Sequence, residues 1–177
     1  MQDVVVFNQM ACSSPHVYFF EKSRYTIREI ASLMKDRFEK LPPKFYAQEI
    51  PEGIAAEILT ERGRYLLDDE KDILKSDDLH WTILMNKNIN LEEPLQGRCI
   101  FIKEVDDITQ VLPLITRKIQ AMSIGILDSE KQKEFATQAT YRGVDRVVIP
   151  GKIHDFDLPW DGMLSLNRLV RWVILKR

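Results

Sequence analysis

Strand-like and helix-like segments alternate along almost the whole chain, and this alternation constrains the fold more than any other feature of the sequence. Short runs rich in β-branched and aromatic residues predict strands at residues 4–7, 17–20, 80–86, 98–105, 119–127 and 145–151. Apolar side chains at helical spacing predict helices at residues 27–41, 51–67, 106–116 and 129–142. Such alternation is typical of an α/β fold with a parallel or mixed sheet flanked by helices.

The segments between these elements are polar and rich in turn-forming residues. Residues 67–78 read LDDEKDILKSDD and predict a charged surface connection, whereas residues 86–97 read NKNINLEEPLQG and predict a turn-rich loop. Because no linker-like stretch interrupts the pattern, we predict a single domain over residues 1–177.

Two of the predicted helices carry capping signals. Thr26 is followed three residues later by Glu29, which is the spacing of a capping box. Ser129 and Gln132 repeat that spacing, and Gly143 suits the position just after the helix end.

The composition excludes several classes of function. A net charge of −2 argues against electrostatic binding to nucleic acid or to an anionic membrane. No apolar run approaches the roughly 18 to 20 residues that a membrane-spanning helix needs. The two cysteines, Cys12 and Cys99, make no disulfide framework, and free thiols favour a cytoplasmic location.

The sequence lacks the usual motifs for phosphates and metals. Its 7 glycines are too widely spaced for either the G-x-G-x-x-G pattern or a P-loop. Acidic residues and one histidine gather late in the chain, but their spacing matches no known metal-binding loop. We therefore predict no metal site there; the residues concerned are His154, Asp155, Asp157 and Asp161.

Cys12 has the setting of a possible nucleophile. It lies in the stretch FNQMACSSPHVYF, residues 7–19, between two predicted strands and just before a turn. A thiolate beside backbone N–H groups would be activated, and those groups could receive an oxyanion. The residues alone leave a reactive and a structural thiol both open, and His16 is either a partner of the thiol or an exposed loop residue. Cys99, by contrast, lies inside a predicted strand and is interpreted as a packing residue.

Two stretches of the sequence resemble a known family. The stretch FNQMACSSPHVYF is similar to the nucleophile segment of the long-chain acyl-CoA reductases of bacterial bioluminescence. A second block, GVDRVVIPGKIHDFDLPWDG at residues 143–162, resembles that family's run ending in Trp-Asp-Gly, and residues 123–139 between the two blocks fit as well. The similarity covers essentially the whole chain in the same order.

The resemblance implies a fold and a reaction. The family belongs to the aldehyde dehydrogenase superfamily, so an aldehyde-dehydrogenase-like catalytic domain is expected. A cysteine there takes the acyl group from a long-chain acyl-CoA or acyl-enzyme donor as a thioester, and NADPH reduces it to a fatty aldehyde. In that family the NADP-binding region precedes this segment. We therefore expect a catalytic portion that can at most be acylated, with NADP bound mainly by a region not present in this chain.

The resemblance also assigns roles to residues. It implies that Cys12 is the nucleophile, with its own backbone N–H at the oxyanion site. Supporting roles fall to Asn8, Gln9, His16, Trp160 and Asp161, of which the last two match the family motif and could instead shape a loop. A homo-oligomer is a possible assembly. The alternative is an inactive truncated remnant, or an assembly subunit, that retains the fold.

Overall fold

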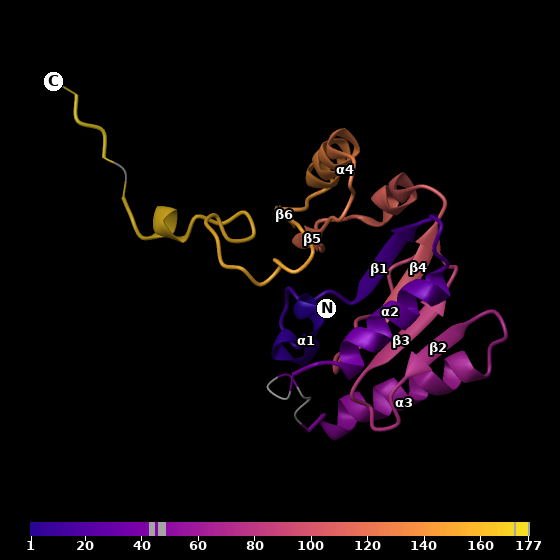
Figure 1. Ribbon diagram of the computed structural model, residues 1–177. Coiled ribbons are helices and arrows are strands. Elements are labelled where there is room, and N and C mark those ends of the chain that lie inside the picture. Colours follow the sequence, from indigo (N-terminus) through magenta and orange to yellow (C-terminus); the bar gives the residue numbers. More distant parts are fainter. Residues whose placement is uncertain (43–44, 46–48, 172, 177) are drawn as a thin grey trace. The chain divides into compact units, whose positions relative to one another are not determined.

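The computed structural model describes residues 1–42, 45, 49–171 and 173–176. It divides into two compact units, Met1–Leu114 and Ile115–Arg177, which are described separately below (Figure 1). That residues 1–177 fold as a single domain stays a prediction.

The first unit is built on a four-stranded mixed sheet with the order β1-β4-β3-β2. Strands β1 and β3 both pair in parallel with β4, and β2 runs antiparallel to β3. The strand bounds are Val17–Glu21 for β1, Asp72–Lys75 for β2, Thr82–Asn86 for β3 and Cys99–Val105 for β4. The mixed sheet and its flanking helices confirm the predicted α/β class (Figure 1).

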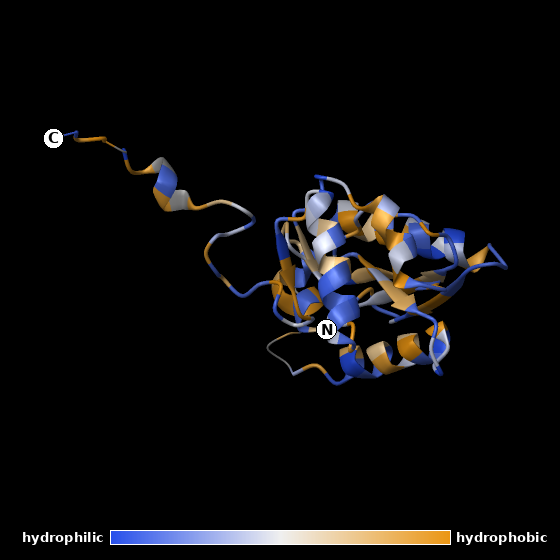
Figure 2. Cartoon of the chain, turned by 90° about the horizontal axis from the view of Figure 1, so that it is seen from above, coloured by the Kyte–Doolittle hydropathy of each residue, from blue (hydrophilic) through white to orange (hydrophobic). Residues whose placement is uncertain are grey.

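Two helices cover the two faces of this sheet. Since successive side chains of a strand point to opposite faces, alternate strand residues contact different helices. Helix α2, Ile27–Glu39, packs Ala31 and Phe38 into a cluster that includes Ile83 and Ile102. Helix α3, Glu52–Leu66, packs its apolar side against Leu84 of β3 and against Cys99 and Phe101 of β4. Polar and apolar residues accordingly alternate around these helices (Figure 2).

The capping prediction for α2 is confirmed. The Thr26 side chain accepts a hydrogen bond from the Glu29 backbone N–H, and the Glu29 carboxylate accepts one from the Thr26 N–H at 2.8 Å. These two bonds satisfy donors that the first turn of a helix otherwise leaves open.

Two predictions for this unit are wrong. Residues 4–7 form no strand: they belong to the short helix α1, Gln2–Val5, and the 3₁₀ helix η1, Val6–Gln9. Val4 and Val5 are buried in the cluster beneath α2, so their apolar character reflects burial and not strand pairing. Residues 67–78 contain the edge strand β2, whose two apolar residues are partly buried while the acidic residues around them lie at the surface.

The second unit holds a two-stranded parallel sheet and one helix. Strands β5, Ala121–Ser123, and β6, Arg146–Val148, confirm shorter versions of the predicted strands. Helix α4, Ser129–Tyr141, is also confirmed, but its N-cap is Asp128 and not Ser129. The Asp128 carboxylate accepts hydrogen bonds from the backbone N–H groups of the next turn, and a carboxylate does this as well as a hydroxyl.

Two 3₁₀ helices complete the described elements. Residues Ile108–Leu114 form η3 where a short helix was predicted, and Ser165–Arg168 form η4. Within the residues that the structure describes, no helix has the length and apolar character needed to cross a bilayer.

Candidate functional site at the Cys12 loop

Cys12 is exposed in a tight turn between η1 and β1. The turn is closed by a 2.9 Å hydrogen bond from the Ser14 backbone N–H to the Ala11 carbonyl oxygen. The backbone N–H of Cys12 itself donates no hydrogen bond to any part of the chain that the structure describes. The thiol is therefore accessible, and whether it is reactive or structural stays a prediction.

The residues just before Cys12 have an unusual backbone. Phe7, Asn8 and Gln9 have φ angles of 58°, 51° and 62°, so three consecutive residues other than glycine are left-handed. Each such residue costs roughly 1–2 kcal/mol, and such conformations persist only where surrounding contacts impose them.

Gln9 supplies much of that constraint. Its side chain is 1% exposed, and Nε2 donates to the Pro15 carbonyl oxygen at 2.8 Å and to the Cys99 carbonyl oxygen at 3.0 Å. These bonds connect the two sides of the Cys12 turn with the first residue of β4. Gln9 is therefore a structural support of the Cys12 loop.

The connection between β3 and β4 holds the same loop from a second side. The Gly97 N–H donates to the Asn8 carbonyl oxygen at 3.2 Å, and His16 Nδ1 lies 2.7 Å from the Leu95 carbonyl oxygen. Residues 95 and 97 are contributors that the sequence analysis missed, since a turn-rich loop carries no signal of what it will contact.

His16 is half-buried and not a fully exposed loop residue. The carbonyl acceptor places a proton on Nδ1, which leaves Nε2 with a lone pair in the neutral ring. Burial lowers the pKa of His16, so the neutral ring is favoured, although the bond to Leu95 opposes this shift. No hydrogen bond links His16 to Cys12 among the described residues, and its role as a partner stays a prediction.

Trp160 and Asp161 belong to the second unit, where they bind Arg146. The Arg146 Nε atom donates to Asp161 Oδ1 at 2.7 Å, and the guanidinium lies 4.3 Å from the centre of the Trp160 ring. The Phe156 ring stacks on the Trp160 ring, with 5.4 Å between the ring centres. These contacts organise the segment after β6.

The acidic residues near Asp161 are similarly occupied. Asp161 binds Arg146, and Asp155 pairs with Lys152 at 2.7 Å. Across the described residues, no three histidine, cysteine, aspartate or glutamate side chains form a metal-binding group.

Two of the glycines lie where the chain packs closely on itself. A Cβ atom at Gly97 would lie 3.0 Å from Ile58, and one at Gly162 would lie 2.8 Å from Asp145. These positions are glycine because the chain packs closely on itself and because φ is positive there. Local packing and backbone conformation therefore explain Gly97 and Gly162 without a phosphate ligand.

Cys99 is the packing residue that the sequence predicts. It is fully buried in β4, and burial raises the pKa of its thiol from the ordinary 9.0 to about 12. The two thiols thus differ sharply in accessibility: Cys12 is exposed and Cys99 is not.

The raised pKa of Cys99 leads us to expect a lower free energy of unfolding at alkaline pH. Its pKa is raised in the folded protein, so its contribution is complete below pH 9.0 and is lost as the pH rises toward 12. At pH 10 the unfolded thiol ionises and the folded one does not, which lowers the free energy of unfolding by about 1.4 kcal/mol. Urea unfolding at pH 8 and pH 10 measures this, and Cys99→Ala is expected to lose that part of the pH dependence. An identical pH dependence in the two proteins would contradict the assignment.

Comparison with known proteins gives a consistent picture. The family model described as acyl-CoA reductase (LuxC) matches residues 1–172. Two proteins named "Long-chain acyl-protein thioester reductase", from Photorhabdus laumondii and Photorhabdus luminescens, are each 29% identical over 99% of this chain. "Long-chain acyl-protein thioester reductase 2" of Photobacterium leiognathi is 22% identical over the same share.

These relatives are longer proteins. The chain spans about a third of their length, since the aligned region covers 36% of each relative. The family model, however, covers nearly all of the chain, in agreement with the resemblance in its Cys12 and Trp160 blocks. The chain therefore belongs to the acyl-CoA reductase (LuxC) family.

Proposed function

We propose that this chain is the acyl-accepting portion of a long-chain acyl-CoA reductase, with Cys12 as the nucleophile. The observation that supports this most directly is the exposed Cys12 thiol in a turn that Gln9 and Gly97 hold from two sides. The family membership supports the class of reaction, and the relatives' names add that a thioester is what they reduce.

The proposed step exchanges one thioester for another. The Cys12 thiolate attacks the carbonyl carbon of the donor, the new S–C bond forms, and the donor S–C bond breaks. The departing thiolate then takes up the proton that Cys12 released. The exchange is nearly isoenergetic, and in this proposal the Cys12 backbone N–H donates to the developing oxyanion.

The reduction that completes the reaction is assigned to the whole protein. NADPH would supply a hydride to the acyl carbon there and yield the fatty aldehyde. NADP as cofactor and kinship with the aldehyde dehydrogenase superfamily are parts of this proposal that rest on the resemblance. What the chain's own residues contribute is the thiol, its orientation and the oxyanion donor.

The name of the relatives bears on the donor and not on the nucleophile. A long-chain acyl group carried as a thioester on a protein cysteine or on CoA presents a similar carbonyl carbon to Cys12, and either carrier departs as a thiolate. We propose either carrier as the donor and a homo-oligomer as the assembly. The two free thiols favour a cytoplasmic location.

The experiment is intact-mass analysis of the chain after incubation with tetradecanoyl-CoA. We expect one added tetradecanoyl group on the parent chain and none on Cys12→Ser, because the remaining thiol, Cys99, is buried. Peptide mapping then locates the adduct. The small thioester S-tetradecanoyl-N-acetylcysteamine is the second donor, because it requires no site for CoA.

Absence of an adduct with both donors, on a chain that circular dichroism shows to be folded, would contradict the proposal. That outcome favours the second candidate, an inactive subunit that serves assembly. One observation supports this candidate: the apolar side chains late in the second unit are largely exposed, among them Leu169, Val173, Ile174 and Leu175.

A further inference from the structure

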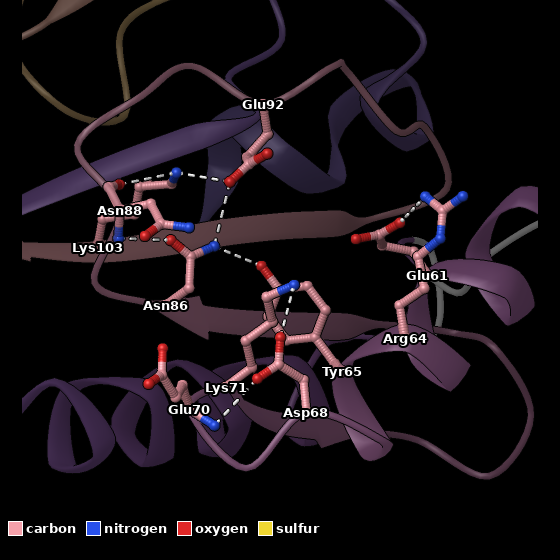
Figure 3. Close-up of polar contacts among 10 residues, drawn as sticks. All are labelled: Glu61, Arg64, Tyr65, Asp68, Glu70, Lys71, Asn86, Asn88, Glu92 and Lys103. Carbon is pink, nitrogen blue, oxygen red and sulfur yellow. Dashed lines mark hydrogen bonds and ion pairs between the residues drawn. The ribbon is translucent and has the colours of Figure 1, made fainter.

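Lys103 is a lysine with no exposed surface, and it faces Asn86 at the last paired position of β3 and β4. Its Nζ atom donates to the Asn88 carbonyl oxygen at 3.0 Å and to Glu92 Oε1 at 2.6 Å (Figure 3). It also donates to Asn90 Oδ1. All three acceptors lie in one segment, the β3–β4 connection at residues 87–97. A buried ammonium that uses all three of its protons on one loop fixes the course of that loop.

A second set of bonds joins this connection to the strand before it. Asn86, the last residue of β3, donates from Nδ2 to Glu92 Oε1 at 3.1 Å and to the Tyr65 hydroxyl. The Asn88 backbone N–H donates to Asn86 Oδ1 at 3.0 Å (Figure 3). Strand, helix α3 and connection therefore share one polar network around Lys103.

The far end of the same connection holds the Cys12 loop. Leu95 accepts from His16 and Gly97 donates to Asn8, on either side of the thiol in the sequence. Gly97 also packs tightly on Ile58, which restricts how that end can move. Residues 87–97 are thus anchored to Lys103 at one end and to the Cys12 loop at the other.

We propose that Lys103 is a positioning residue for Cys12, acting through the β3–β4 connection. This inference rests on the proposed function and adds a residue that no part of it includes. The ammonium fixes Asn88, Asn90 and Glu92, and the connection then presents Leu95 and Gly97 to the loop that carries the thiol. Lys103 touches neither the thiol nor a bound acyl group; its effect is on where the thiol and its N–H lie.

The chemistry of the network requires the cation. Two neutral oxygens and one carboxylate converge on Nζ, and a neutral side chain of similar length offers them no proton. Burial lowers the pKa of Lys103 and the Glu92 carboxylate raises it, so the network is also what compensates the buried charge.

The test compares Lys103→Met with Lys22→Met. Lys22 lies in the same unit but forms an exposed pair with Asp106, so its loss serves as the matched control. For each variant we would measure the rate of Cys12 acylation by tetradecanoyl-CoA, the rate of Cys12 alkylation by iodoacetamide, and amide hydrogen exchange. Acyl transfer needs an aligned thiol and oxyanion donor, whereas alkylation needs mainly an accessible thiol.

For Lys103→Met we expect acylation to slow by about tenfold or more, while alkylation changes by less than about twofold. Amide exchange is expected to speed up in residues 88–97 and 8–16 but not in α2. Lys22→Met is expected to leave all three measurements unchanged.

Equal changes in acylation and alkylation, or unchanged exchange in residues 8–16, would overturn the proposal, since both indicate a purely structural lysine. If Lys103→Met does not fold, Asn90→Ala removes one acceptor and leaves the other two, and the same pattern is expected at smaller size. A parent chain that is folded but never acylated contradicts the proposed function alone, and hydrogen exchange still decides whether Lys103 acts on the Cys12 loop.

Discussion

Substituting Arg62 with methionine is expected to lower the free energy of unfolding of the unit Met1–Leu114 by about 2–4 kcal/mol. Arg62 is 4% exposed, and its guanidinium donates three 2.9 Å hydrogen bonds, to the Thr82 hydroxyl and to the Ser76 and Trp81 carbonyl oxygens. It therefore joins helix α3 to the turn between β2 and β3. Methionine fills much of the volume but donates nothing to these acceptors, and relief of the buried charge offsets only part of the loss.

Arg64→Met on the same helix is the matched control. Arg64 is exposed and pairs with Glu61 at 2.9 Å, so its replacement is expected to change stability by less than about 0.5 kcal/mol. Native-state hydrogen exchange of the β3 and β4 amides reports on this unit directly. Equal effects of the two substitutions would show that the three bonds of Arg62 contribute nothing beyond those of a surface arginine.

Replacing Asp161 with alanine is expected to destabilise the unit Ile115–Arg177 by about 3–5 kcal/mol. Arg146 and Asp161 are both 8% exposed, and Arg146 also donates to the Ile153 carbonyl oxygen at 2.8 Å. Without the carboxylate the guanidinium remains buried beside Trp160 with its charge uncompensated. Loss of a partner from a buried pair costs far more than the pair itself contributes.

The control is Asp155→Ala, because Asp155 pairs with Lys152 at the surface and its loss is expected to cost less than about 1 kcal/mol. Exchange of the α4 amides measures the stability of this unit. The same variants also test the role that the resemblance assigns to Asp161. A loss of Cys12 acylation with unchanged α4 exchange would contradict a structural role and assign Asp161 to the reaction.

The parts of the fold that the sequence predicts correctly depend on short-range patterns. The capping box at Thr26 and Glu29 and the apolar stripe behind it specify α2 locally. Strands β1, β3 and β4 each contain a short continuous apolar run, VYFF, ILM and CIFI respectively, which is a local signal for a strand.

Where the prediction fails, the deciding contact is distant in the sequence. Strand β2 was missed because Asp72 and Lys75 surround only two apolar residues, and its pairing with β3 is not visible locally. The apolar run at residues 4–7 predicts a strand, but four consecutive apolar residues suit a short helix equally well. Lys103 reads as a surface residue until the connection that covers it is known.

For the candidate site, too, the sequence indicates the local features but not the contacts that are distant in the sequence. Residue types and the Ser-Ser-Pro turn predict that Cys12 lies in a loop, and the structure adds that its side chain is exposed. Of the three left-handed residues before it, only Asn8 has an intrinsic tendency toward that conformation. The loop is supported by Cys99, Gly97 and Leu95, which are distant from it in the sequence and therefore give no local signal.

The sheet order has a consequence for how the protein is synthesised. Strand β1 is made before its partner β4, so Val17 cannot pair until Phe101 has left the ribosome. Strands β2 and β3 are neighbours in sequence and can pair much sooner. During that interval the aromatic strand at residues 17–20 has no partner, which makes it the segment of a nascent chain that most needs protection from aggregation. The Cys12 loop likewise lacks its support until Cys99 has left the ribosome.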